Sequence, residues 1–296
     1  MASPMRGVLP AVVTPFDSND QFAPAAMETL LDRLYARGAH GIYVLGQTGE
    51  GLLTPLATRI RVAEVAIKAS PGDKTVIIHV GAARTADAVE LARHASKAGA
   101  HAISSLAPIG GYSFAEIRRY YETLTAASDL PLLVYFFPEV SPAVSTADQI
   151  FDLCSIPGVA GLKFTDFDLF TMSRISLARH TIFNGRDEVF AAGMLMGASG
   201  GIGSFYNLVP ELFVEVYDLA AKQQWAEARR VQDRINQLIA QTIRFPVFPA
   251  IKRMLAWSGI DCGACVGPRR ALTSAEEASL RQGLADVDFN AEGFLR

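Results

Sequence analysis

Cysteine is scarce in this sequence of 296 residues, which holds only Cys154, Cys262 and Cys265. Three cysteines are too few for a disulfide framework, so the composition favours a reducing compartment and we expect a cytoplasmic protein. Cys262 and Cys265 form one CxxC motif, but no histidine or cysteine follows it. Because a structural zinc site needs four ligands, we expect no metal at this motif.

Long apolar runs and an excess of one charge are also missing. No uninterrupted apolar stretch approaches the roughly 20 residues of a membrane-spanning helix, so we expect no membrane anchor. No basic and apolar leader opens the chain, and we expect no secretory signal. The formal net charge is −3, from 27 basic and 30 acidic side chains. This balance is too close to neutrality to predict a nucleic-acid partner.

Short apolar runs recur along the first two thirds of the chain. Most are rich in Val, Ile and Leu without alternation, which is typical of parallel strands that are buried on both faces. The eight runs cover 7–13, 41–46, 75–81, 101–106, 130–137, 158–164, 181–185 and 200–204.

Helical patterns fill the intervals between these runs. Residues 27–38 and 85–99, for example, carry apolar side chains at three-to-four spacing and end at a glycine. Eight such units predict an α/β fold, a (β/α)8 TIM barrel over 1–222, with a helical region over 223–296 packed on it. A doubly wound open sheet is the alternative, but no GxGxxG motif follows the first strand.

Lysine is rare, with six residues against 21 arginines, and one of the six lies in an apolar strand. Five read as solvated, including Lys252, whereas Lys163 follows Leu162 and precedes Phe164. Burial disfavours the charged form, and lowering a lysine pKa by three units, at a cost of roughly 4 kcal/mol, leaves half of it neutral near pH 7. A neutral amine can form a Schiff base with a ketone. The alternative is a side chain that reaches out of the barrel to Asp166.

In a barrel of this kind the active site lies at the C-terminal ends of the strands. The loop GQTGEG (46–51) combines three glycines with the Thr48 hydroxyl, and exposed N–H groups near a helix start favour an anion. This loop could bind a small carboxylate or a phosphate, or be an ordinary tight turn. Tyr135, near the end of the fifth strand, could relay protons if it faces Lys163, or could simply fill the barrel.

The seventh and eighth strands also end in polar residues. Asp187 and Glu188 suit the start of a helix, and their role could be limited to capping it. Alternatively, they could accept hydrogen bonds from a polyol at the barrel mouth. Ser204 adds a hydroxyl beside glycines that let a ligand approach. His79, in the third strand, is expected to be a core histidine rather than a catalyst.

Together these motifs resemble the N-acetylneuraminate lyase and dihydrodipicolinate synthase superfamily of class I pyruvate aldolases. The resemblance runs from about residue 6 to 210 and continues weakly through VGPRRALT (266–273). The motifs that carry it are, in order, RGVLPAVVTPFD, GQTGEG, VIIHVGA, LLVYFFP, GLKFTDFDLF, FNGRDEVF and GGIGSFYN.

The resemblance implies an aldolase, usually a homotetramer, that releases pyruvate and an aldehyde through a lysine Schiff base and without another cofactor. It implies that Lys163 forms the Schiff base, that Tyr135 shuttles the proton, and that Thr48 and Gly49 hold the pyruvate carboxylate. The other residues expected to line the substrate site are Gln47, Thr165, Gly185, Asp187, Glu188 and Ser204.

Within the superfamily the lyases resemble this chain more closely. The synthases place an arginine shortly after the catalytic tyrosine, and residues 135–145 contain none. Gln47 stands where a Ser or Thr is usual, Phe136 replaces an asparagine, and 107–114 replaces a segment with adjacent aromatics. These three are departures from the family pattern. The missing arginine and the motifs GLKFTDFDL and NGRDE favour a lyase that acts on a 2-keto-3-deoxy sugar acid or an N-acetylneuraminate-like acid.

Four other functions stay open from the residues alone. A synthase-type condensation and a dehydration of a keto-deoxy acid would both use Lys163. A keto-acid binder without catalysis would keep the cavity but not the turnover. A metal-dependent aldolase is the least favoured, because no cluster with metal-ligand spacing lies at the strand ends.

Overall fold

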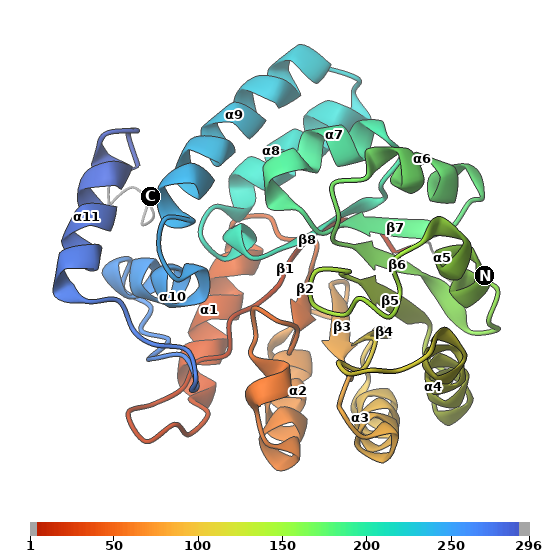
Figure 1. Cartoon of the computed structure of the whole chain (residues 1–296). Coiled ribbons are helices and arrows are strands. Elements are labelled where there is room, and N and C mark those ends of the chain that lie inside the picture. Colours follow the sequence, from red (N-terminus) through yellow and green to blue (C-terminus); the bar gives the residue numbers. More distant parts are fainter. Residues whose placement is uncertain (1–4, 290–296) are drawn as a thin grey trace.

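Eight parallel strands form one sheet in the computed structural model, which describes residues 5–289. The strand order is β1-β8-β7-β6-β5-β4-β3-β2, and a parallel bridge between Ala11 and Tyr43 joins β1 to β2 and closes the barrel (Figure 1). The strands are β1 (Gly7–Pro10), β2 (Gly41–Val44), β3 (Thr75–His79), β4 (Ala102–Leu106), β5 (Leu132–Phe136), β6 (Val159–Phe164), β7 (Thr181–Asn184) and β8 (Gly200–Gly203). The predicted TIM barrel is confirmed.

Helices follow the strands and cover the outside of the barrel (Figure 1). They are α1 (Pro24–Ala36), α2 (Leu56–Ala69), α3 (Thr85–Ala98), α4 (Phe114–Ala127), α5 (Ala147–Cys154), α6 (Leu169–Leu177), α7 (Phe190–Leu195) and α8 (Pro210–Ala221). Short 3-10 turns follow three strands: η1 (Gly51–Leu53), η2 (Asp187–Val189) and η3 (Phe205–Asn207). These turns lie at the C-terminal ends of β2, β7 and β8, where the candidate site residues were expected.

The strands separate two layers of apolar side chains, which explains why their sequences do not alternate. One layer fills the barrel and includes Leu9, Ile77, Leu133 and Ile202. The other lies between the strands and the outer helices. Every strand is therefore buried on both faces.

The C-terminal region consists of α9 (Trp225–Thr242), α10 (Val247–Trp257) and α11 (Ser274–Ala285). Figure 1 shows α9 running along α8 and α11 lying outermost. Gln232 on α9 donates a hydrogen bond from Nε2 to the Asp187 carbonyl (3.0 Å), and its Oε1 accepts one from the Ala191 N–H (2.9 Å). Asn236, one turn further along, donates to the Glu188 carbonyl (3.0 Å). This region therefore fixes the turn after β7.

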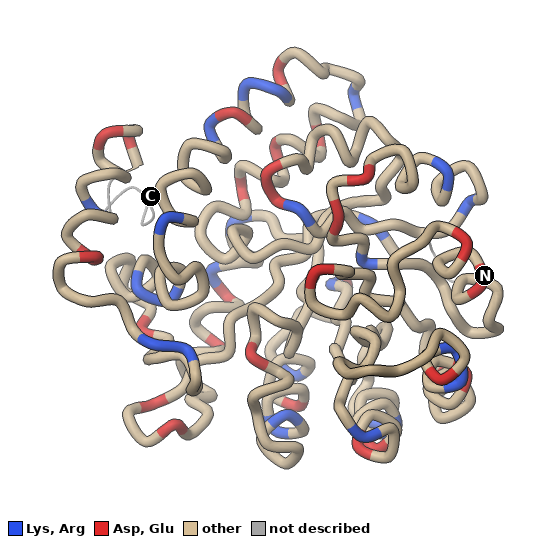
Figure 2. The backbone as a smooth tube through the Cα atoms, in the orientation of Figure 1, with Lys and Arg blue, Asp and Glu red and all other residues tan. Residues whose placement is uncertain are grey.

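Charges of both signs occur on the outer helices (Figure 2). Acidic and basic residues are mixed over the outer helices as a whole, and neither sign covers a whole side of the molecule in this view. Within residues 5–289, no helix has the combination of length and apolar character that crossing a bilayer requires.

Candidate active site

A cavity of about 420 Å³ opens at the C-terminal ends of the barrel strands. Every site residue predicted from the sequence lines it except Gly49. Gly49 lies behind the cavity wall, where its carbonyl accepts a hydrogen bond from the Thr14 hydroxyl (2.6 Å). The sequence did not single out several other lining residues, which are Phe137, Arg186, Ile202, Gly203, Phe205, Val247 and Phe248.

Lys163 points into the barrel at the C-terminal end of β6 and is only 4% exposed. Its neighbours in the strand, Leu162 and Phe164, pack on the opposite side against the helices. Lys163 pairs in register with Tyr135 on β5, and its Nζ lies 4.0 Å from the centre of the Tyr135 ring and 4.6 Å from that of Tyr43. Strand pairing thus places the amine between two aromatic side chains.

Burial determines the charge state of this amine. Desolvation lowers the pKa of Lys163 from 10.5 to about 7, and the nearby Asp187 carboxylate opposes part of this shift. The side chain does not reach out to Asp166, whose carboxylate instead accepts the Phe167 N–H (2.6 Å). A substantial share of Lys163 is therefore a neutral nucleophile at neutral pH.

Asp187 is the second buried ionisable group in the cavity. Desolvation raises its pKa to about 7, while the Phe205 N–H, which donates to Oδ2 (2.8 Å), and the charge of Lys163 act in the other direction. A Cβ on Gly203 would lie 1.9 Å from Oδ1, so the carboxylate occupies space that only glycine leaves free. Lys163 and Asp187 consequently both change protonation near neutrality.

Tyr135 faces the barrel interior, as its alternation with Val134 and Phe136 allows. Its ring lies edge-on to Tyr43 and stacks on Phe137, with ring centres 6.1 and 5.9 Å apart. Burial raises the pKa of the phenol, and the Thr165 hydroxyl and Arg186 offset part of the rise. The free protein therefore presents a protonated phenol beside the lysine.

The loops after β2 and β8 meet at the cavity. The hydroxyl groups of Thr48 and Ser204 lie 2.6 Å apart and share a hydrogen bond. Gln47 also lines the cavity, and its backbone carbonyl accepts a hydrogen bond from the Arg269 guanidinium (3.1 Å). The hydroxyls and loop together provide polar groups for a small carboxylate on one side of Lys163.

Glu50 and Lys252 form a buried ion pair directly behind this loop. Glu50 has a left-handed backbone (φ 58°) and a side chain that is fully buried. Its carboxylate lies 2.8 Å from the Lys252 Nζ and 3.5 Å from Arg269, and it accepts the Val266 N–H (2.7 Å). Three groups from the C-terminal region thus hold the loop that carries Thr48.

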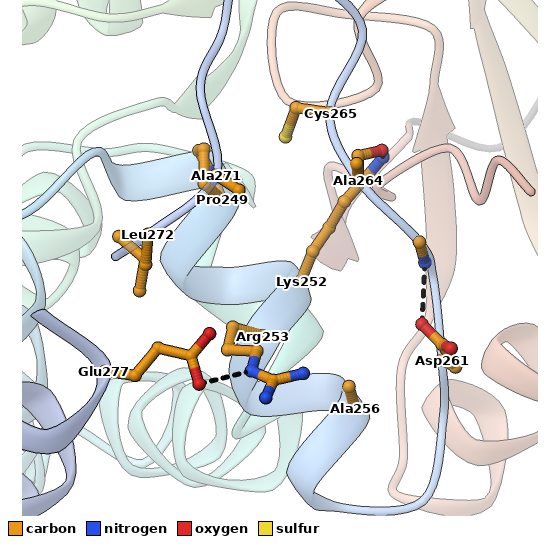
Figure 3. Close-up of a pocket in the computed structure, with 11 residues that line it drawn as sticks. Pro249, Lys252, Arg253, Ala256, Asp261, Ala264, Cys265, Ala271, Leu272 and Glu277 are labelled. Atoms are coloured by element: carbon orange, nitrogen blue, oxygen red, sulfur yellow. Dashed lines mark hydrogen bonds and ion pairs between the residues drawn. The ribbon is translucent and has the colours of Figure 1, made fainter. Parts of the chain in front are cut away.

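The prediction that Lys252 is solvated is wrong, because its side chain is only 2% exposed. Figure 3 shows Lys252 extending from α10 toward Ala264, whose carbonyl accepts its hydrogen bond (2.8 Å). The adjacent Arg253 turns instead to Glu277 (2.8 Å), across a second cavity of about 200 Å³ (Figure 3). Lys252 is therefore buried, whereas Arg253, its neighbour in the sequence, is exposed to solvent.

His79 and the cysteines are buried side chains. The Nε2 of His79 accepts the Leu106 N–H (3.0 Å), and burial holds the pKa of the imidazole well below its usual range. All three cysteines are free, and burial raises the pKa of each thiol to 11 or 12. Within the described part of the chain, no group of three His, Cys, Asp or Glu side chains could hold a metal ion.

A closed parallel barrel with a desolvated lysine at its mouth fits an enzyme that acts through a Schiff base, and the relatives place the chain among the carbon–carbon lyases of that class. Comparisons with known proteins agree with this class. The profile of the dihydrodipicolinate synthetase family matches residues 4–286, and the chain belongs to that family. The resemblance stated from the sequence is confirmed.

Relatives and solved structures point to the lyase branch of the family. The N-acetylneuraminate lyase of Rhizobium meliloti (strain 1021) is 36% identical over 289 residues, which cover 96% of this chain and 95% of that protein. A Ruminococcus gnavus sialic acid aldolase superposes with a TM-score of 0.90 at 28% identity, over 96% of this chain and 98% of that one. A Clostridium difficile structure described as CdNal in complex with mannosamine gives a TM-score of 0.91 at 26% identity, over 96% of this chain and 100% of that one. The protein is a class I pyruvate aldolase or lyase.

Proposed function

We propose that the protein cleaves a 2-keto-3-deoxy sugar acid or an N-acetylneuraminate-like acid to pyruvate and an aldehyde. The observation that carries this proposal is the buried Lys163, whose pKa near 7 makes its amine a nucleophile, beside Tyr135 in a cavity of about 420 Å³. The names of the relatives give the substrate class. No cluster or motif in the described residues favours a different reaction.

The reaction begins when the neutral Lys163 amine attacks the C2 ketone, and the Tyr135 phenol then protonates the hydroxyl group that leaves as water, which gives an iminium ion and a phenolate. The positive charge then lies about where the Lys163 Nζ lies, 4.0 Å from the Tyr135 ring centre. A nearby cation favours the phenolate, so Tyr135 can accept the C4 hydroxyl proton. The C3–C4 bond breaks, its electron pair forms an enamine, and the aldehyde leaves. Protonation at C3 and hydrolysis then release pyruvate and the lysine.

The remaining lining residues orient the substrate in this scheme. Thr48, with the Gly49 loop and Gln47 beside it, holds the carboxylate of the keto acid. Asp187, Glu188 and Ser204 accept or donate hydrogen bonds along the hydroxylated chain, and Gly185 and Thr165 shape the wall near the aldehyde part. A Cβ at Gly185 would lie 2.1 Å from the Thr165 hydroxyl oxygen, so only glycine fits beside Thr165 at this position of the wall.

The same proposal extends to cofactors, assembly and location. The lysine adduct is the only covalent chemistry that the reaction needs, so the enzyme works without a separate cofactor. Family resemblance supports a homotetramer, and the low number of cysteines supports the cytoplasm.

Borohydride trapping tests this function. The protein is incubated with pyruvate, reduced, digested and mapped by mass spectrometry, and the expected result is a reduced pyruvyl group on Lys163. An unmodified Lys163 in folded protein would overturn the proposal. Product analysis with keto-deoxy acids then separates cleavage, which releases an aldehyde, from dehydration, which releases only water. Trapping without any turnover would indicate a binder.

The rate of trapping should depend on pH in a way set by Lys163. Only the neutral amine reacts, so with a pKa near 7 the rate should fall about tenfold per unit below pH 6 and level off above pH 8. Asp187→Asn removes the carboxylate that raises this pKa, so the midpoint should move to lower pH. A midpoint near that of an ordinary lysine, in wild-type protein, would contradict the assignment.

A further inference from the structure

Arg186 is the one cationic side chain besides Lys163 that lines the substrate cavity among residues 5–289. It lies in the turn after β7, and its side chain is 15% exposed. The guanidinium carbon lies 4.4 Å from the centre of the Phe167 ring and 5.4 Å from that of Phe137. These two aromatic contacts hold the charged group at a defined place in the cavity wall.

The hydrogen bonds of this guanidinium are incomplete. One terminal nitrogen pairs with Glu139, in the loop after β5, while the buried Nε has no partner. The side chain of Glu139 is 62% exposed, and an exposed partner of this kind contributes little and is easily exchanged. Arginine presents a planar fork that suits a carboxylate through two parallel hydrogen bonds. Arg186 is therefore only partly satisfied in the free protein.

The barrel topology places Arg186 away from the loop that is proposed to bind the first carboxylate. The pair of Arg186 and Glu139 connects the loops after β7 and β5, so it spans the end of β6, which carries Lys163. The pair of Thr48 and Ser204 connects the loops after β2 and β8, across the end of β1. The charge of Arg186 also lowers the pKa of Tyr135, which places the guanidinium near the reacting centre.

We propose that Arg186 binds a second carboxylate at the far end of the substrate, and that the preferred substrate is a 2-keto-3-deoxy sugar acid with a carboxylate at each end. This inference rests on the proposed function, because it takes the first carboxylate and the keto group to be held by the Thr48 loop and Lys163. Glu188 lines the same cavity and repels an anion, so the second carboxylate needs the positive charge of Arg186 to bind there. On binding it replaces Glu139 and supplies the missing acceptor.

Two keto acids of equal length test this proposal. 2-Oxoadipate and 2-oxohexanoate share a chain of six carbons, but only the first has a distal carboxylate. Each competes with isotope-labelled pyruvate for borohydride trapping at Lys163, and the concentration that halves the labelled adduct is measured. We expect 2-oxoadipate to compete at least tenfold better. The corresponding diacids and monoacids with five and seven carbons should show the best chain length.

Three variants assign any preference to the arginine. In Arg186→Met the ratio between the two acids should fall to about one, and Arg186→Lys should restore part of it. In Glu139→Gln the ratio should rise, because Arg186 loses its competing partner. Equal competition by diacids and monoacids at all three lengths in the wild type, or a ratio that survives in Arg186→Met, would overturn the proposal.

The control separates this result from the proposed function itself. Labelled pyruvate has no distal group, so its trapping in the wild type tests Lys163 alone. If pyruvate is trapped but the acids compete equally, only the role of Arg186 fails. If pyruvate is not trapped on Lys163 at all, both proposals fail together.

Discussion

Replacing Lys163 with methionine should abolish turnover and make the protein more stable. The variant keeps the shape of the side chain but removes the nucleophile, so cleavage should drop by on the order of 10⁴-fold or more, with no borohydride adduct. The gain in stability follows from the pKa, which folding lowers from 10.5 to about 7. At 1.36 kcal/mol per unit, the wild type gives up roughly 4 kcal/mol at pH 7 to bury this amine.

The pH dependence of this stability gain has a defined sign. Because the folded pKa lies below the unfolded one, the unfolded chain binds more protons between about pH 7 and pH 10.5. The penalty is complete below pH 7 and disappears as the pH rises toward 10.5. Denaturant unfolding at pH 7 and pH 10 should therefore show a large difference between variant and wild type at pH 7 and a small one at pH 10.

Lys252→Met is the matched control, because Lys252 is equally buried but paired with Glu50. Its removal leaves a carboxylate without its closest partner, so this variant should lose stability where Lys163→Met gains it. Loss of stability in both variants at pH 7 would contradict the account of Lys163 as an unpaired, partly neutral amine.

The second large effect is expected from Glu50→Gln. This substitution leaves Lys252 buried without a counter-charge, and breaking a buried pair costs about 3–5 kcal/mol. Because Glu50 follows Gly49 directly, the loop that carries Thr48 should also lose its position. We therefore expect a lower free energy of unfolding and, in the folded protein, a higher pyruvate concentration for half-maximal trapping.

Glu277→Gln provides the control for this prediction. Glu277 makes an ion pair with Arg253 of the same length, 2.8 Å, but Arg253 is 47% exposed (Figure 3). An exposed pair contributes about 0–1 kcal/mol, so this variant should behave almost like the wild type. A double variant with Glu50→Gln and Lys252→Met should recover part of the lost stability. If Glu50→Gln and Glu277→Gln lowered the free energy of unfolding equally, burial of the ion pair would not explain its contribution to stability.

Much of the barrel could be predicted from the sequence because its signals are local. Each strand is an apolar run bounded by turn residues, and Lys163 stands out because it interrupts one of them. The observed strands are shorter than predicted, and in all runs but those of β4 and β6 the last residues leave the sheet to form the loops of the cavity. In β1, for example, Val12 and Val13 stay buried but lie beyond the strand.

The residues that were missed depend on partners far away in the sequence. Lys252 is recognisable as buried only once Glu50 is placed beside it. Arg269 is recognisable as a partner of the loop after β2 only once Gln47 is placed beside it. Arg186 reads as a solvated turn residue until Phe137 and Phe167 from other loops pack against it. The absence of an arginine from 135–145 was correctly observed, but the structure brings Arg186 to Glu139 within that stretch.

The closure of the barrel also affects when the chain can finish folding. The Asn207 side chain donates to the carbonyl of Ala11, 196 residues earlier (2.7 Å), and β1 pairs with β8 along its whole length. At roughly 5–20 residues per second, synthesis needs on the order of 10–40 s to cover this interval. During that time one edge of β1 has no partner. Contacts of such sequence separation slow folding and expose an apolar strand, so the growing chain depends on protection from aggregation until β8 emerges.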